Sequence, residues 1–164
     1  MAAATGLPAG SGIIYRSFGR AGAEAEASAL ARLAKDRGLV LLIGADADLA
    51  AKIGADGVHL PERMVMRAPR LRARHSNWIL TTAVHNRRAL EYAKALKLDG
   101  AFLSAVLPSQ SPSAGVPMGP VRLAQYVSGS DLPIMALGGI TAKTGQGLIA
   151  TGIYGLAAIE GLRI

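Results

Sequence analysis

Short apolar runs alternate with helix-like segments along nearly the whole chain, and no other feature limits its fold as strongly. Parallel strands need a long crossover connection, which is usually a helix. Strands that alternate with helices are therefore expected to run parallel. The run at 39–43, Leu-Val-Leu-Leu-Ile, is continuous and therefore typical of a strand buried on both faces. The segments that we interpret as strands are 12–15, 39–43, 58–60, 78–82, 100–103, 133–137 and 154–158.

The segments between these strands carry helical periodicity and helix-ending signals. Ala25, Ala29, Leu30 and Leu33 fall on one face of a helix predicted over 21–37, and Gly38 follows it where a left-handed C-cap is expected. The other predicted helices span 46–52, 87–96, 121–127 and 144–150.

Glycines mark three helix-to-strand connections in a similar way: Gly54-Ala55-Asp56-Gly57-Val58, Leu98-Asp99-Gly100-Ala101 and Gly152-Ile153-Tyr154-Gly155-Leu156. One glycine can end the helix and a second lets the turn pass close to the sheet. The strands do not cluster into two halves, and no Gly-x-Gly-x-x-Gly turn follows the first. The sequence therefore predicts an α/β fold of the TIM-type (β/α)₈ barrel class rather than a doubly wound sheet.

The predicted organisation is a single (β/α) barrel domain over 12–164, preceded by an irregular N-terminal arm at 1–11. About seven strands are visible, so we expect an incomplete barrel that lacks its first strand and last helix. Open strand edges at Ile13 and Tyr154 would pair with each other, be covered by the arm or be buried in a homo-oligomer. The sequence leaves these three possibilities open.

The composition limits the kinds of site and the cellular location that we expect for this protein. The chain has no cysteine, which excludes disulfides, thiolate metal sites and cysteine nucleophiles and favours a cytoplasmic location. No signal peptide is recognised at the start, and no apolar stretch approaches the roughly 20 residues that span a bilayer. We therefore expect a cytoplasmic protein with no membrane partner.

The formal net charge of +7 is concentrated in one segment, which carries Arg63, Arg67, Arg70, Arg72 and Arg74. Such a cluster is typical of a surface that binds the phosphate backbone of nucleic acid or another anionic surface. It is equally typical of a solvated helix face. Because no aromatic platform or known binding motif accompanies the cluster, nucleic acid is not the favoured partner.

In a βα barrel the functional groups lie where strands end, in the loops that follow them. The strongest candidate is Leu137-Gly138-Gly139-Ile140-Thr141, where a strand ends in two glycines whose backbone N–H groups are open to an anion. This turn and Ile159, after the last strand, are predicted to bind phosphate. A tight turn that requires positive φ would also explain the two glycines, but their placement after the next-to-last strand favours phosphate binding.

Three motifs occur in an order that resembles the thiamine phosphate synthase family and its thiazole tautomerase (TenI-like) branch. They are Gly57-Val58-His59-Leu60, Leu107-Pro108-Ser109 with Pro117-Met118-Gly119, and Leu137-Gly138-Gly139-Ile140-Thr141. The resemblance implies a (β/α)₈ barrel that joins a hydroxymethylpyrimidine diphosphate to a thiazole phosphate, with Mg²⁺ on the diphosphate. It also implies a small phosphorylated metabolite as the partner.

Carried over by position, the family's substrate contacts fall on Arg16 and on Ser109 and Ser111 of the Ser109-Gln110-Ser111-Pro112 run, which replaces Thr-x-Thr-Lys. Other family positions have lost their chemistry: Phe18 replaces a lysine, Gly44-Ala45 an Asn-Asp pair, Met64 the metal-binding aspartate (with Glu62 close by), Ala83 a serine and Ala105 the tautomerase histidine. A diphosphate carries about three negative charges and needs metal or paired cations, so the resemblance implies Mg²⁺ whose ligands this chain does not retain.

No catalytic residue can be assigned. His59 ends a buried strand and is interpreted as a core histidine, while His85 is either a helix N-cap or a functional group. Glu160 replaces a small residue beside the expected phosphate and would repel it. Three hypotheses remain: a synthase-family protein with weakened catalysis, a non-catalytic phosphometabolite-binding member, and a basic nucleic-acid or anionic-surface binder.

Overall fold

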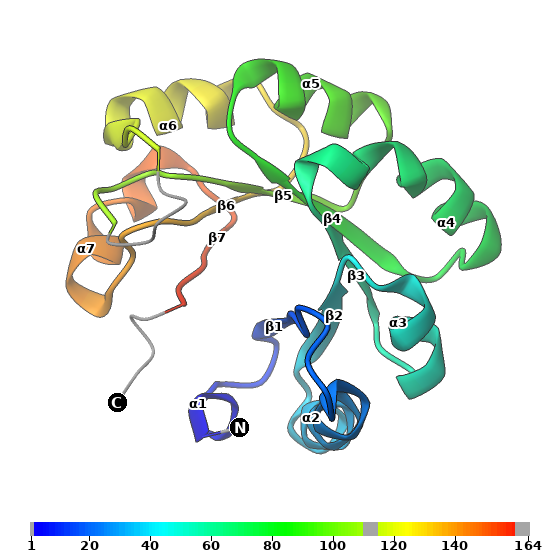
Figure 1. Cartoon of the computed structure of the whole chain (residues 1–164). Helices are drawn as coiled ribbons and strands as arrows, with labels where there is room; N and C mark the ends of the chain where they lie inside the picture. The colour runs from blue at the N-terminus through cyan, green and yellow to red at the C-terminus, as the bar shows by residue number, and fades with distance from the viewer. Residues whose placement is uncertain (1, 110–114, 160–164) are drawn as a thin grey trace. The chain divides into compact units, whose positions relative to one another are not determined.

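The computed structural model describes residues 2–109 and 115–159, and it divides into two compact units, 1–80 and 81–164. Each unit is built from βα repeats (Figure 1). The two are described separately below. The prediction of one domain over 12–164 stays a prediction.

The first unit contains three parallel strands with helices between them. Its elements are α1 (Ala2–Thr5), β1 (Gly12–Tyr15), α2 (Ala23–Arg37), β2 (Val40–Gly44), α3 (Ala47–Ile53), β3 (Gly57–Leu60), the 3₁₀ helix η1 (Glu62–Arg67) and α4 (Ala68–Arg74). β2 pairs with β1 on one side and with β3 on the other. In this register Tyr15 lies beside Ile43, and Gly44 beside His59, so the three strands end at one edge.

The second unit repeats the pattern with four parallel strands in chain order. Its elements are β4 (Ile79–Val84, which begins at the end of the first unit), α5 (Arg87–Ala95), β5 (Gly100–Leu103), α6 (Gly119–Ser128), β6 (Ile134–Ala136), α7 (Ala142–Gln146), the 3₁₀ helix η2 (Ile149–Thr151) and β7 (Gly155–Leu156). Helices α5 and α6 lie on the same face of these strands (Figure 1).

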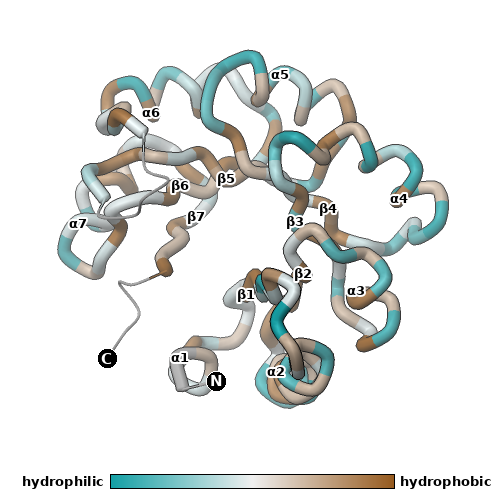
Figure 2. Tube along the Cα trace, viewed as in Figure 1, coloured by the Kyte–Doolittle hydropathy of each residue, from teal (hydrophilic) through white to brown (hydrophobic). Residues whose placement is uncertain are grey.

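Aliphatic strand residues form the core of each unit. Leu41, Leu42 and Ile43 are consecutive and all buried, which confirms that this run is covered on both faces. The tube in Figure 2 is accordingly hydrophobic along β2, whereas the arginine-bearing turns of α4 are hydrophilic. The fully buried large side chains of the second unit include Val84, Leu90, Leu103, Leu123 and Leu148.

Glycine geometry confirms most of the predicted connections. Gly38, Gly54 and Gly152 end their helices in the left-handed conformation, at φ 62°, 68° and 81°. A Cβ at Gly57 would lie 1.9 Å from the carbonyl oxygen of Ile79, so no larger residue fits this close approach. The connection between α5 and β5 differs, because the non-glycine Lys97 takes the positive φ there, at 52°.

Two local predictions need correction, and two helices were missed. Residues 144–150 do not form one helix: α7 ends at Gln146 and η2 follows, with Gly147 between them. η1 and α4 were not predicted, because their arginine-rich sequence lacks apolar periodicity and only Ala68 of the two helices is buried. The arm at 1–11, expected to be irregular, contains the single helical turn α1.

Candidate functional site

The parallel register of the first unit brings three strand ends to one cleft. Arg16 follows β1, Gly44 and Ala45 close β2, and Pro61 follows β3. The N–H of Ala45 donates to the carbonyl oxygen of His59 at 2.9 Å, which ties the ends of β2 and β3 together. The cleft has a volume of about 590 Å³.

Arginine dominates the lining of this cleft. Arg63, Arg67, Arg70 and Arg74 reach it from η1 and α4, and Arg16 reaches it from the end of β1. We call these five residues and the space between them the arginine cleft. The structure thus brings the arginine-rich segment of the sequence together with Arg16, the family position that keeps its basic residue.

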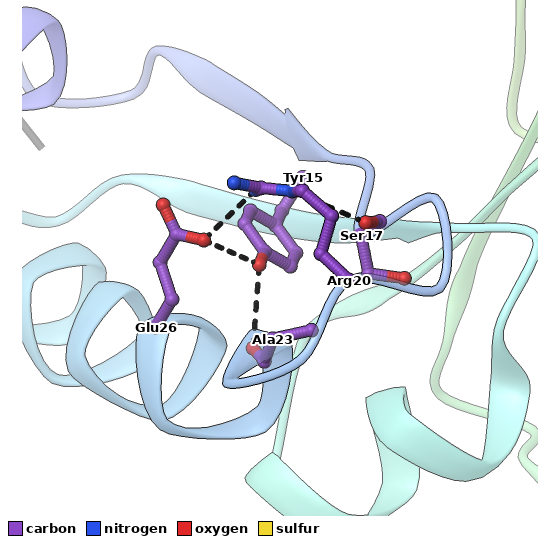
Figure 3. A network of polar contacts seen from close by, with 5 residues as sticks. All are labelled: Tyr15, Ser17, Arg20, Ala23 and Glu26. Atoms are coloured by element: carbon purple, nitrogen blue, oxygen red, sulfur yellow. Dashed lines mark hydrogen bonds and ion pairs between the residues drawn. The ribbon is translucent and has the colours of Figure 1, made fainter.

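The loop that carries Arg16 is held by a polar network (Figure 3). The hydroxyl group of Tyr15 lies 2.7 Å from Oε2 of Glu26 and donates its proton there, while Nη2 of Arg20 lies 2.9 Å from the same oxygen. Nε of Arg20 donates to the carbonyl oxygen of Ser17 at 3.3 Å. The hydrogen bond from Tyr15, with a further contribution from Arg20, lowers the pKa of Glu26; burial and Glu26 raise the pKa of Tyr15. The loop is therefore anchored to α2 through a charged hydrogen bond.

His59 is neutral at neutral pH. Burial, with a smaller contribution from the positive charge of Arg16, lowers its pKa to about 4. A neutral imidazole can accept or donate a hydrogen bond but carries no charge to offer an anion. This agrees with its interpretation as a core histidine.

The first unit does not fit the Mg²⁺ ion that the family resemblance implies. Across residues 2–109 and 115–159, no group of three His, Cys, Asp or Glu side chains is placed to hold a metal ion. Two carboxylates, Asp46 and Asp48, line the arginine cleft, and Oδ1 of Asp46 already accepts the N–H of Leu49 at 2.9 Å as the N-cap of α3. Five guanidinium groups in the same cleft would repel a divalent cation.

In the second unit, the turn after β6 has the backbone conformation that glycine favours. Gly138 and Gly139 have φ values of 97° and 67°. A Cβ at Gly139 would lie 2.3 Å from the carbonyl oxygen of Pro108, and one at Gly138 would lie 3.0 Å from Cα of Ala105. Tight packing against the loop after β5 is therefore sufficient to require both glycines, whatever the turn binds.

The start of α7 is partly satisfied within the chain. Oγ1 of Thr141 accepts the N–H of Thr144 at 3.1 Å, and Oγ1 of Thr144 accepts the N–H of Thr141 at 2.8 Å, which makes a reciprocal capping box. Among the described residues, the N–H groups of Gly138, Gly139 and Ile140 have no backbone acceptor. They remain the donors that this turn could offer to an anion.

The remaining predicted site residues are placed as follows. Ile159 lies shortly after β7 and is 74% exposed. Just before it, the N–H of Ala157 donates to the carbonyl oxygen of Ala136 at 2.8 Å. The chain therefore leaves the sheet at the edge where Gly138 lies. Ser109 is half-buried in the loop after β5. Ser111 and Glu160 lie outside the described residues.

One polar pair in the second unit was not found from the sequence. Nδ1 of His85 lies 3.1 Å from both Oγ and the carbonyl oxygen of Ser104. The two residues follow adjacent strands, β4 and β5, and only the strand register brings them together. The N-cap interpretation of His85 is wrong, because the side chain of Asn86 caps α5 by accepting the N–H of Ala89 at 2.9 Å.

Comparisons with known proteins agree on one family. The model described as thiamine monophosphate synthase matches residues 9–162. A putative thiamine-phosphate synthase 2 of Aquifex aeolicus is 31% identical over 128 residues, which cover 78% of this chain and 68% of that protein. A putative thiamine-phosphate synthase of Geobacter sulfurreducens is 33% identical over 83% of this chain, but the match spans only 64% of the relative.

The fold is matched by the thiamine phosphate pyrophosphorylase of Pyrococcus furiosus, with a TM-score of 0.79 and 20% identity. The match covers 91% of this chain and 72% of that structure, and it confirms the predicted α/β class with an incomplete TIM-type barrel. Separately, no helix among the described residues is long and apolar enough to cross a membrane. The match over residues 9–162 shows that the chain belongs to the thiamine monophosphate synthase family.

Proposed function

We propose that this chain is a phosphometabolite-binding member of its family in cytoplasmic thiamine biosynthesis, with strongly weakened synthase catalysis. Its proposed ligand in the second unit is a thiazole phosphate or thiamine phosphate at Gly138, Gly139 and Ile159. One observation carries the proposal: the positions that supply the family's lysine and metal-binding aspartate hold Phe18 and Met64, while the glycine turn is intact.

The chemistry of the reaction explains why these replacements matter. Displacement of a diphosphate builds negative charge on the leaving group, and metal ions or fixed cations stabilise that charge. Phe18 is 75% exposed and has no charge to offer, although the guanidinium of Arg16 stacks over its ring at 4.6 Å. The residues that this chain retains support binding of a phosphate better than they support its departure.

The catalytic part of the proposal is tested by incubating the full chain with hydroxymethylpyrimidine diphosphate, thiazole phosphate and Mg²⁺. The thiamine-phosphate synthase of Vibrio campbellii, which is 30% identical over 83% of this chain, serves as the positive control. The expected rate is below about 1% of that control, because removing fixed charge stabilisation costs roughly 10²–10³ in rate. Formation of thiamine phosphate at a comparable rate would contradict the proposal.

The binding part is tested by thermal shift with thiazole phosphate, thiamine phosphate and inorganic phosphate. Ile159→Asp adds a second carboxylate next to Glu160 in the sequence and should abolish the stabilisation. Ile159→Asn, whose side chain has nearly the shape of aspartate but no charge, should keep most of it. Ile159 is exposed, so neither variant should disturb the core. The absence of stabilisation by all three compounds in the unaltered chain would end this proposal.

A further inference from the structure

The arginine cleft brings together exposed arginines from separate elements, which a solvated helix face does not require. Arg63, Arg67, Arg70 and Arg74 recur at spacings of four, three and four residues, and all four line the same cleft. Arg16 joins them from a different element, the end of β1. A charged helix face that served only solubility would need no such convergence with a distant strand end.

The five guanidinium groups are not engaged by the protein's own carboxylates. Among the described residues, none of the five forms an ion pair with an acidic side chain; Arg16 stacks over Phe18, and its positive charge acts on His59. Arg72, between them in the sequence, behaves differently, because its Nη1 donates to the carbonyl oxygens of Ser76 and Trp78. Like charges three and four residues apart repel each other and destabilise a helix, so an anion in the cleft would relieve an existing repulsion.

The charge and size of the cleft define the class of that anion. Five arginines face two aspartates, Asp46 and Asp48, which leaves a formal excess of three positive charges. A guanidinium group presents a fork of N–H donors that matches phosphate oxygens two at a time. A volume of about 590 Å³ lies within the range of pockets that hold small molecules.

We infer that the arginine cleft binds a diphosphate group directly on its guanidinium groups, without a divalent metal ion. This differs from the metal-dependent diphosphate binding implied by the family resemblance, because arginines of η1 and α4 supply the positive charge here. The inference concerns the first unit alone and does not depend on the phosphate site proposed at Gly138 and Gly139. The two can therefore fail separately.

The test is calorimetric titration of inorganic diphosphate into the full chain, once in EDTA and once with Mg²⁺ in excess. We expect diphosphate to bind in EDTA, and we expect Mg²⁺ to lower the Kd by no more than about twofold. Arg67→Gln with Arg70→Gln should weaken binding at least about tenfold, since two charge-assisted hydrogen-bonding groups are lost. The matched pair Arg32→Gln with Arg122→Gln removes the same net charge from exposed positions outside the cleft and should leave the Kd within about twofold.

Three results would overturn the inference. Binding that appears only with Mg²⁺ would show that a metal ion is required after all. Equal weakening of diphosphate binding by the two double variants would show that net charge, and not the cleft, determines the affinity. Displacement of diphosphate by a short single-stranded DNA at lower concentration, with a steep salt dependence, would make the cleft part of a nucleic-acid surface. Circular dichroism melting of each variant separates loss of binding from loss of fold.

Discussion

The two units offer an anion opposite kinds of chemistry. In the first, side chains from η1, α4 and the end of β1 converge on a cleft with an excess of positive charge. In the second, the turn at Gly138 and Gly139 offers only backbone N–H groups and packs so closely on the loop after β5 that no side chain fits. Side chains can be exchanged without disturbing the fold, whereas a backbone turn cannot. The comparison teaches that an anion can be offered side chains that tolerate substitution, as in the first unit, or backbone N–H groups whose turn does not, as in the second.

The largest expected effect is on the backbone-built turn. Gly139→Ala places a Cβ 2.3 Å from the carbonyl oxygen of Pro108 and forces alanine to a φ of 67°, which should cost about 2–4 kcal/mol of stability. Gly147→Ala is the control, since its φ is −68° and its Cβ would meet nothing closer than 3.8 Å. Urea unfolding measures both. Equal stability of the two variants would show that the turn at Gly139 tolerates a side chain after all.

The anchoring of the loop that carries Arg16 is expected to depend on pH. The pKa of Glu26 is lowered in the folded state, mainly by the hydrogen bond from Tyr15, so its stabilising contribution is present above the ordinary glutamate pKa and is lost as the pH falls through the lowered value. Tyr15→Phe should lower Tm at pH 7 by about 2–4 °C, and by less at acid pH. Melting curves between pH 7 and pH 3 test this, with Tyr126→Phe as the control. A difference that is constant over that range would show that Glu26 is not the partner that matters.

Charge tuning of the arginine cleft should change binding without changing the fold. Asp46→Asn keeps an effective N-cap for α3 but removes one of the two negative charges in the cleft. Removing that charge should strengthen diphosphate binding about two- to fivefold. Asp36→Asn, on the exposed part of α2 and outside the cleft, is the matched control. If both substitutions strengthen binding equally in calorimetry, the effect belongs to net charge and not to the cleft.

The smallest expected effect separates function from stability. Arg70→Gln removes a like-charge neighbour of Arg67 and Arg74 and should raise the stability by about 0.2–0.5 kcal/mol per relieved contact, while it weakens diphosphate binding. Arg32→Gln provides the comparison on α2. Thermal melting at low salt detects the difference best, because salt screens it. A loss of stability in Arg70→Gln would mean that this arginine has a structural role.

The order of most helices and strands could be predicted, because apolar runs and helix-ending glycines are signals carried by neighbouring residues in the sequence. The run at 39–43 indicates a buried strand, and the glycines after α2 and α3 indicate left-handed caps, from the residues alone. η1 and α4 could not be predicted in this way, because their one buried residue, Ala68, produces no apolar period. The predicted helix over 144–150 was wrong, because α7 ends at Gln146 and Gly147 lies between it and η2.

The candidate sites depended on features that sequence patterns do not contain. The arginine-rich segment and Arg16 were each identified, but only the parallel register of β1, β2 and β3 and the path of η1 bring them to one cleft. The pairing of His85 with Ser104 likewise depends on the register of β4 and β5. For Gly138 and Gly139 the sequence identified the turn, and the structure added the close packing that by itself requires glycine.

The most direct test of the account is a crystal structure of the full chain grown with inorganic diphosphate in EDTA. The account predicts diphosphate density in the arginine cleft, within hydrogen-bond distance of the guanidinium groups of Arg67 and Arg70 and with no metal ion beside it. Diphosphate that is seen only after Mg²⁺ is added, bridged through the ion to Asp46 or Asp48, would contradict the claim that arginines replace the metal in this chain.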